Sequence, residues 1–253
     1  MKLALVIPTY TPHFIYLKEL CRNIAEQTRL PDLVIIRASS CDCEAAKLVL
    51  DTLRESSWPF PLQIIDTPAQ QYQAQNRNEG ADAVPPEFDV ISFFDSDDLM
   101  HPRRLEFLEL AFLQGAEAVL HDYDHGSAGS TPIWRRFDGY PSHVWDSILL
   151  QKESAIQSGA QIVSRSEILK AYPGCIAGGK EIIFLRPITM DEELEEAIKI
   201  HYGHVSVSMN VFRAIRFDED ALGYEDAKYL SDIVLQRYKT MSLRAELSFY
   251  TSR

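Results

Sequence analysis

Long hydrophobic runs are missing from this sequence. No apolar stretch approaches the roughly 18 residues that a membrane-spanning helix requires, so no such helix is expected. Cysteine is scarce as well: four residues in 253 do not make a disulfide framework, and Cys41 and Cys43 form a lone pair without the further ligands that structural zinc requires. The apolar segment from Met1 to Pro8 is too short for a secretory signal and instead predicts a first buried strand. We therefore expect a cytoplasmic protein with reduced thiols.

Positive charge is in deficit. The chain has 25 Lys and Arg against 37 Asp and Glu, a net charge of −12, and its basic pairs Arg103-Arg104 and Arg135-Arg136 are isolated. An acidic surface repels a polyphosphate backbone, so the sequence predicts no nucleic-acid partner. The hydrophobic share of 46% and the charged share of 25% are typical of a folded globular protein.

The first 125 residues alternate between strand and helix patterns. Apolar, β-branched segments predict strands at 3–7, 33–36, 62–65, 90–94 and 118–120. Helical periodicity predicts helices at about 14–24, 45–53, 72–84 and 102–113, with Asp42 capping the second and Pro102 opening the fourth. Since such helices connect strands by right-handed crossovers, we predict an α/β fold with a mostly parallel central sheet and helices on both faces.

The pattern is less regular beyond residue 125. We predict loops at 126–139 and 173–179 and helices at 191–200 and 226–238. Trp134 and Trp145 lie in this stretch and are either packing residues or sugar-stacking residues. His201 and His204 are either ligands or sugar contacts, or belong to an ordinary polar loop, which is the favoured interpretation. The segment from His121 to His125 leaves three alternatives open, namely a metal site, a sugar contact or a polar strand end.

The strongest local signal is the run Phe93-Phe-Asp-Ser-Asp-Asp98, in which Asp95, Asp97 and Asp98 directly follow a predicted buried strand. Three carboxylates this close repel one another and raise one another's pKa values. A divalent cation removes that penalty, and hard oxygen ligands suit Mg²⁺ or Mn²⁺. The alternative is that Asp97 or Asp98 simply caps the next helix.

Four segments in a fixed order carry a family resemblance: Val6-Ile-Pro-Thr-Tyr10, Asn76-Arg-Asn-Glu-Gly80, Asp95 to Pro102, and Phe217-Asp-Glu219 followed by Gly223-Tyr-Glu-Asp226. Together they resemble the motifs of inverting glycosyltransferases of family two. The resemblance implies the GT-A fold, a Rossmann-like α/β architecture. It also implies a single domain over residues 1–253, with a nucleotide-sugar-binding half at 1–125 and an acceptor-binding half at 126–253. Residues 126–200 carry none of these motifs.

The resemblance also implies roles for individual residues. Six are expected to bind the nucleotide sugar: Pro8, Thr9, Tyr10, Arg77, Asn78 and Asp97. Asp95, Asp97 and Asp98 would hold a Mn²⁺ or Mg²⁺ ion at the donor diphosphate. Asp226 would be the general base on the hydroxyl of a glycan or other acceptor, and Glu225 would bind the acceptor or orient the base.

One departure from the family pattern concerns the nucleotide base. Family members usually carry two acids at the end of the second strand, and one of them contacts the base. This chain has Arg37 and Ala38 there. The replacement favours a guanine or thymine nucleotide, or a different base contact, over uridine.

Three other functions are weighed against a metal-dependent sugar transferase. A haloacid-dehalogenase-like phosphatase places its D-x-D after the first strand, whereas here the motif follows the fourth. A sugar-nucleotide pyrophosphorylase needs a glycine-rich phosphate loop, and residues 9–14 contain no glycine. An inactive binding protein that kept the fold is the remaining alternative, supported by Arg37 and Ala38.

Overall fold

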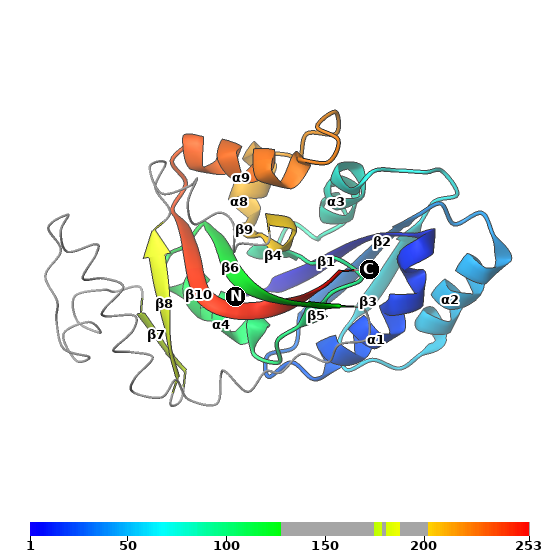
Figure 1. Ribbon diagram of the computed structural model, residues 1–253, viewed down its shortest axis with the longest axis horizontal. Helices are drawn as coiled ribbons and strands as arrows, with labels where there is room; N and C mark the ends of the chain where they lie inside the picture. The colour runs from blue at the N-terminus through cyan, green and yellow to red at the C-terminus, as the bar shows by residue number, and fades with distance from the viewer. Residues whose placement is uncertain (128–174, 179–180, 188–201, 253) are drawn as a thin grey trace, which may run out of the picture.

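Ten strands make up the central sheet of the described residues, which are 1–127, 175–178, 181–187 and 202–252 of this computed structural model (Figure 1). The strands are β1 Leu3–Tyr10, β2 Leu33–Ser39, β3 Leu62–Asp66, β4 Val90–Phe93, β5 Leu99–Met100, β6 Ala118–Ser127, β7 Cys175–Gly178, β8 Glu181–Pro187, β9 Ser206–Ser208 and β10 Thr240–Ser252. The helices are α1 Phe14–Ala25, α2 Glu44–Glu55, α3 Gln73–Asp82, α4 Arg104–Leu113, α8 Met209–Ala214 and α9 Glu225–Leu235, with short 3₁₀ turns at Thr11–His13 and Tyr202–His204. None of these helices is long and apolar enough to span a bilayer.

The strand order is β3-β2-β1-β4-β9-β6-β10-β8-β7, with β5 paired to β10. Strands β3, β2, β1 and β4 run parallel, as do β6 and β10. β9 lies between β4 and β6 and is antiparallel to both. The predicted α/β class with a mostly parallel sheet is confirmed, and all five predicted strands are present.

Several sequence predictions about individual elements are wrong. β9 and β10 were not predicted, although Met241, Leu243, Leu247 and Phe249 alternate in β10 and are all buried. The predicted loop at 173–179 contains β7, and β6 continues to Ser127, so His121 to His125 are not a strand end. The predicted helix at 191–200 lies outside the described residues, as do Trp134 and Trp145.

Helix starts also differ from the predictions. Cys43, and not Asp42, caps α2, since its Sγ accepts a bond from the Ala46 amide. α4 begins at Arg104, two residues after Pro102, and α9 covers 225–235 instead of 226–238. Local capping signals compete over a few residues at each helix end, which is why boundaries are harder to predict than elements.

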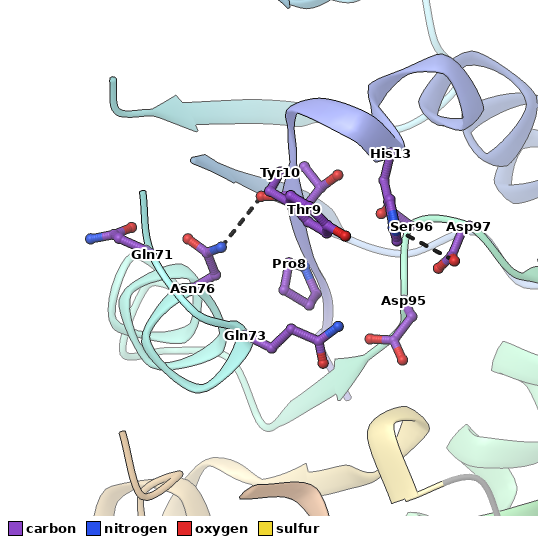
Figure 2. Close-up of a pocket in the computed structure, with 10 residues that line it drawn as sticks. All are labelled: Pro8, Thr9, Tyr10, His13, Gln71, Gln73, Asn76, Asp95, Ser96 and Asp97. Atoms are coloured by element: carbon purple, nitrogen blue, oxygen red, sulfur yellow. Dashed lines mark hydrogen bonds and ion pairs between the residues drawn. The ribbon is translucent and has the colours of Figure 1, made fainter. Parts of the chain in front are cut away.

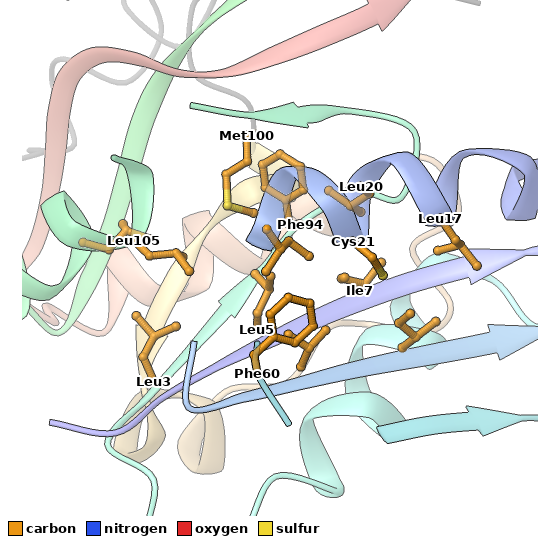
Figure 3. Close-up of a cluster of buried hydrophobic side chains, with 14 of the residues drawn as sticks. Leu3, Leu5, Ile7, Leu17, Leu20, Cys21, Phe60, Phe94, Met100 and Leu105 are labelled. Atoms are coloured by element: carbon orange, nitrogen blue, oxygen red, sulfur yellow. The ribbon is translucent and has the colours of Figure 1, made fainter. Parts of the chain in front are cut away.

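Helices cover both faces of the sheet (Figure 1). Alternate residues of β1 point to opposite faces, and each set joins its own core. Leu3, Leu5 and Ile7 pack with α1, α2 and α4 (Figure 3), whereas Ala4 and Val6 pack with α3, α8 and α9. Apolar burial on both faces fixes the sheet, so its carboxyl edge is a rigid platform.

Helix α3 approaches this platform unusually closely. A Cβ atom at Gly80 would lie 2.8 Å from Cγ1 of Val6 and 3.2 Å from Cβ of Arg37. Only glycine lets the helix pack at this distance. The close packing brings the first turn of α3 next to the carboxyl ends of β1 and β4.

Candidate active site

Two cavities lie at the carboxyl edge of the sheet. A narrow cleft is lined by Pro8, Thr9, Tyr10, His13, Gln71, Gln73, Asn76, Asp95, Ser96 and Asp97 (Figure 2). A wider groove of about 320 Å³ is lined by Tyr72, Gln73, Ala74, Glu219, Ala221, Leu222, Gly223, Glu225 and Asp226. Gln73 belongs to both linings, so the two cavities adjoin. Ligands are expected at this edge of a parallel sheet, and residues from the first and last predicted motifs meet here.

Arg77 forms ion pairs with one carboxylate from each of the two cavities. Its side chain is only 1% exposed. Nη2 donates to Oδ1 of Asp95 at 2.9 Å, and Nη1 donates to Oε1 of Glu225 at 2.8 Å. Burial by itself lowers the pKa of Arg77, but the charges of Asp95, Glu225 and Asp226 raise it above its ordinary value, so the side chain stays protonated. One buried cation therefore connects a carboxylate of the cleft with a carboxylate of the groove.

The acidic segment divides into a buried part and a part facing the cleft. Asp98 is 1% exposed, and its Oδ2 lies 3.0 Å from Nε2 of His204, which is 3.9 Å from Oδ2 of Asp95. Asp97 instead faces the cleft, where its Oδ2 lies 3.6 Å from Nδ1 of His13 (Figure 2). Asp95 contributes to both environments.

Asp95, Asp98 and His204 form a group that fits a divalent cation. One ligand atom from each lies within 4.8 Å of the other two. Two carboxylates and an imidazole are a donor set that suits Mn²⁺, and Asp97 supplies a further carboxylate on the cleft side. The predicted ligands Asp95 and Asp98 are thus brought together, while Asp97 lies outside this group of three.

The favoured interpretation of His204, an ordinary polar loop, is wrong, and the alternative of a ligand is the one that its neighbours Asp95 and Asp98 support. His204 is buried, its ring stacks on Phe94 at a centroid distance of 4.1 Å, and its Nδ1 lies 3.0 Å from Oγ of Ser248. The residue reaches the acidic segment because β9 inserts next to β4. No local pattern around His204 signals this pairing.

Glu225 and Asp226 open helix α9 at the far side of the groove. Glu225 is buried against Arg77, and Asp226 is half-buried with its Oδ1 accepting from the Ala227 amide at 2.7 Å. Burial raises the pKa of the Asp226 carboxyl, and the charges of Glu225 and Asp95 raise it further, so that it exceeds the ordinary value although Arg77 and the amide lower it. A carboxylate with a raised pKa is a stronger base than an exposed aspartate.

Asn78 contacts the segment that leads to Glu225. Its Nδ2 donates to the Phe217 carbonyl and to Oε1 of Glu219, both at 2.9 Å, and its Oδ1 accepts from the Phe217 amide at 3.1 Å. These bonds hold the 217–219 segment against α3. A direct contact between Asn78 and the nucleotide sugar stays a prediction.

Arg37 stands where members of the resembled family usually carry an acid, and its side chain bonds to Glu79 of helix α3. Its Nε donates to Glu79 at 2.8 Å, its Nη2 donates to Oε1 of Gln71 at 2.8 Å, and Gln71 Nε2 donates to Glu79. Gln71 lines the cleft, so Arg37 acts on the cleft by orienting an amide. The cleft lining thus includes a neutral amide that is held by Arg37 and Glu79.

The burial of Arg104 was not predicted, because in the sequence this residue is half of an isolated basic pair with Arg103. Arg104 is fully buried beneath the acidic segment, where it donates to Nε2 of His121 at 2.8 Å, Oγ of Ser92 at 2.9 Å and the His204 carbonyl at 2.9 Å. Burial lowers the pKa of Arg104 to about 9. The side chain fixes His121 and the backbone of His204, so the contacts of His121 favour neither the metal site nor the sugar contact among the three alternatives left open for it.

Replacing Arg104 by Met is expected to destabilise the fold by about 2–4 kcal/mol, because several buried acceptors lose their donor. Chemical denaturation measures the change. The matched control is Arg103→Met, which removes a partly exposed pair with Glu106 and should cost about 1 kcal/mol or less. Equal stability of the two variants would contradict the role of Arg104.

Comparison with known families identifies the chain. The profile of the family described as Glycosyl transferase family 2 matches residues 4–173, and the chain belongs to this family. The matched region includes residues 126–173, which carry none of the motifs, and it ends before the late segment at 217–226. The comparison with curated proteins gave no match.

Solved structures share the fold at low sequence identity. The S. aureus protein TarS, residues 1–349 in complex with UDP, is 14% identical with a TM-score of 0.62, covering 100% of this chain and 61% of that one. The same TarS fragment with UDP-GlcNAc is 15% identical with a TM-score of 0.63, covering 100% of this chain and 59% of that one. The mannosyltransferase PcManGT from Pyrobaculum calidifontis, in complex with GDP-Man and Mn²⁺, is 12% identical with a TM-score of 0.55, covering 98% and 56%. This chain therefore spans about three fifths of each of these three structures, and the likeness establishes the GT-A fold.

Proposed function

We propose that this protein transfers a sugar from a nucleotide-diphosphate donor to an acceptor hydroxyl, with inversion at the anomeric carbon. The observation that carries the proposal is Arg77, which binds Asp95 of the donor cleft and Glu225 of the acceptor groove at once. A single displacement needs the leaving group and the base at the two ends of one continuous site. The chain's family supports a donor of this class, as do the UDP, UDP-GlcNAc and GDP-Man bound by the similar structures.

The nucleotide is proposed to occupy the narrow cleft. Thr9 Oγ1 and Asn76 Oδ1 are buried there and have no hydrogen-bond partner within the described ranges. Buried polar atoms are seldom left unpaired, so a ligand is the natural partner for both. Tyr10 offers an aromatic face at the mouth of the same cleft.

A divalent cation, Mn²⁺ or Mg²⁺, would be held by Asp95, Asp98 and His204, with Asp97 nearby. When bound, such an ion neutralises negative charge on a leaving diphosphate. PcManGT, one of the similar structures, is complexed with Mn²⁺. The buried pair from Arg77 to Asp95 would hold that carboxylate in place, and Oγ of Ser248, 3.0 Å from Nδ1 of His204, would orient the imidazole.

On the acceptor side, Asp226 is proposed to take the proton from the attacking hydroxyl as the new C–O bond forms. Glu225 is fixed by Arg77 and orients the first turn of α9. Arg77 is proposed to act as a positioning residue for both carboxylates, while its predicted contact with the nucleotide stays a prediction. The acceptor is a glycan or another molecule with a free hydroxyl. The division into halves at residue 125 and the cytoplasmic location also stay predictions.

A thermal-shift panel tests the proposal. UDP, GDP, TDP and CMP are each added with and without Mn²⁺, and one diphosphate is expected to raise the unfolding temperature only when Mn²⁺ is present. A ligand at about 100 times its dissociation constant adds about 2.7 kcal/mol to the free energy of unfolding, which is easily detected. If no nucleotide gives a metal-dependent shift, the donor site is wrong.

A further inference from the structure

Gln73 stands at the boundary between the two cavities. It is the first residue of α3, and among the described residues it alone lines both the cleft and the groove. Figure 2 shows its side chain extending from the helix toward Asp95. None of the roles proposed above in donor or acceptor binding belongs to Gln73.

The orientation of the Gln73 amide is fixed by its neighbour. Oε1 lies 3.2 Å from Nη2 of Arg77, four positions along the same helix. A guanidinium can only donate hydrogen bonds, so the oxygen of the amide has to face it. Nε2 is left with both of its hydrogens, and it makes no hydrogen bond to the described part of the chain. The exposed Nε2 donor of Gln73 is therefore oriented by the buried guanidinium of Arg77.

The geometry of the reaction indicates which part of the substrate lies next to Nε2 of Gln73. In a single displacement the transferred sugar lies between the leaving diphosphate and the attacking hydroxyl. Asp95 marks the diphosphate side and Asp226 marks the hydroxyl side, and the residue common to both linings lies where the sugar has to pass. We infer that Nε2 of Gln73 donates a hydrogen bond to an oxygen of the transferred sugar and helps to determine which donor sugar is accepted. This inference rests on the proposed function.

The surrounding charges narrow the class of sugar. Asp95, Glu225, Asp226 and Glu219 line the two cavities on either side of Gln73. The nearby cation, Arg77, is already paired with two of these carboxylates. A carboxylate on the sugar would be repelled. The site therefore fits a neutral hexose or N-acetylhexosamine, whose hydroxyl or acetamido oxygen accepts from the amide.

The test compares a nucleoside diphosphate with its sugar derivative by calorimetry in the presence of Mn²⁺. The probe pairs are UDP with UDP-GlcNAc and GDP with GDP-Man, and the pair that the wild-type protein binds is used. Gln73→Leu keeps the side-chain size and removes the donor. We expect it to weaken binding of the nucleotide sugar about 3- to 10-fold, the value of one neutral hydrogen bond, and to leave binding of the diphosphate unchanged.

The matched control is Gln75→Leu, on the same helix, where the amide bonds to Glu79 and lines neither described cavity. It should change neither affinity. If Gln73→Leu weakens the diphosphate as much as the sugar derivative, Gln73 acts through Arg77 and the inference is wrong. Unchanged affinity for both ligands overturns it as well. If the wild-type protein binds none of UDP, GDP and TDP, the proposed function itself fails, which is a separate result.

Discussion

Replacing Asp226 by Asn is expected to lower turnover about 100-fold or more while donor binding is kept. The amide has nearly the shape of the carboxylate but cannot take the proton of the acceptor hydroxyl. Donor affinity should persist because the cleft, with Thr9 and Asp95, lies on the other side of Gln73. Turnover is measured as release of the nucleoside diphosphate, and donor affinity is measured by calorimetry.

The control for this variant is Asp232→Asn in the same helix. Asp232 pairs with Lys228 at 2.7 Å and belongs to neither described lining, so its loss should leave turnover unchanged. Wild-type turnover in Asp226→Asn would remove Asp226 as the base. Loss of donor affinity in that variant would show that Asp226 serves binding instead of proton transfer.

The same substitution has an expected effect on stability. The pKa of Asp226 is higher in the folded chain than the ordinary value, so ionisation lowers the free energy of unfolding once the pH rises above that ordinary value. At pH 7 the neutral Asn removes this cost, and the variant should unfold at an equal or higher temperature than the wild type. The difference should disappear below about pH 4, where Asp is protonated in both states. A lower unfolding temperature at pH 7 would contradict the assigned direction of the shift.

Replacing Asp95 by Asn is expected to abolish the metal-dependent thermal shift and to lower turnover about 100-fold or more. Asp95 is the carboxylate shared by the cleft and by the group with Asp98 and His204. Its loss also leaves Arg77 with Glu225 as its remaining close carboxylate. Nucleotide titrations with and without Mn²⁺ measure the first effect. A full metal-dependent shift in this variant would place the cation elsewhere.

A companion substitution separates the cation ligands from the rest of the site. His204→Asn should raise the Mn²⁺ concentration for half-maximal activity about 10-fold or more, because an imidazole ligand is lost. His125→Asn, at an exposed position of β6, is the control and should change nothing. An unchanged Mn²⁺ requirement in a folded His204→Asn protein would confine the ligands to the aspartates. Unfolding temperatures of both variants show whether each is folded.

Features encoded by neighbouring residues were predictable. The five strands of the first half, the acidic run after β4 and the pair Glu225-Asp226 each depend on residues close together in the chain. The cleft residues Pro8, Thr9 and Tyr10 were predictable for the same reason. They end the first strand, and the alternation of strands and helices along the chain already indicates that this strand is parallel to its neighbours. Gly80 marks the close approach of α3 in the sequence motif itself.

Features that depend on distant pairing were not predictable. His204 reaches Asp98 because the three-residue strand β9 enters the sheet between β4 and β6, and a strand this short leaves no periodicity to detect. Arg104 looked like a surface charge, yet it lies buried because α4 covers the sheet, and its carbonyl, hydroxyl and imidazole acceptors come from three separate segments.

The sequence alone therefore determined the α/β class, the sheet edge where a ligand is expected and the acidic residues at that edge, since periodicity and strand direction are local properties of the chain. Only the tertiary structure decided that Arg77 binds Asp95 and Glu225 together, across 148 positions of sequence in the second case. It also decided that Gln73 lies between the two cavities. A buried ion pair forms only when packing has removed water and brought its partners together, and that depends on the whole fold.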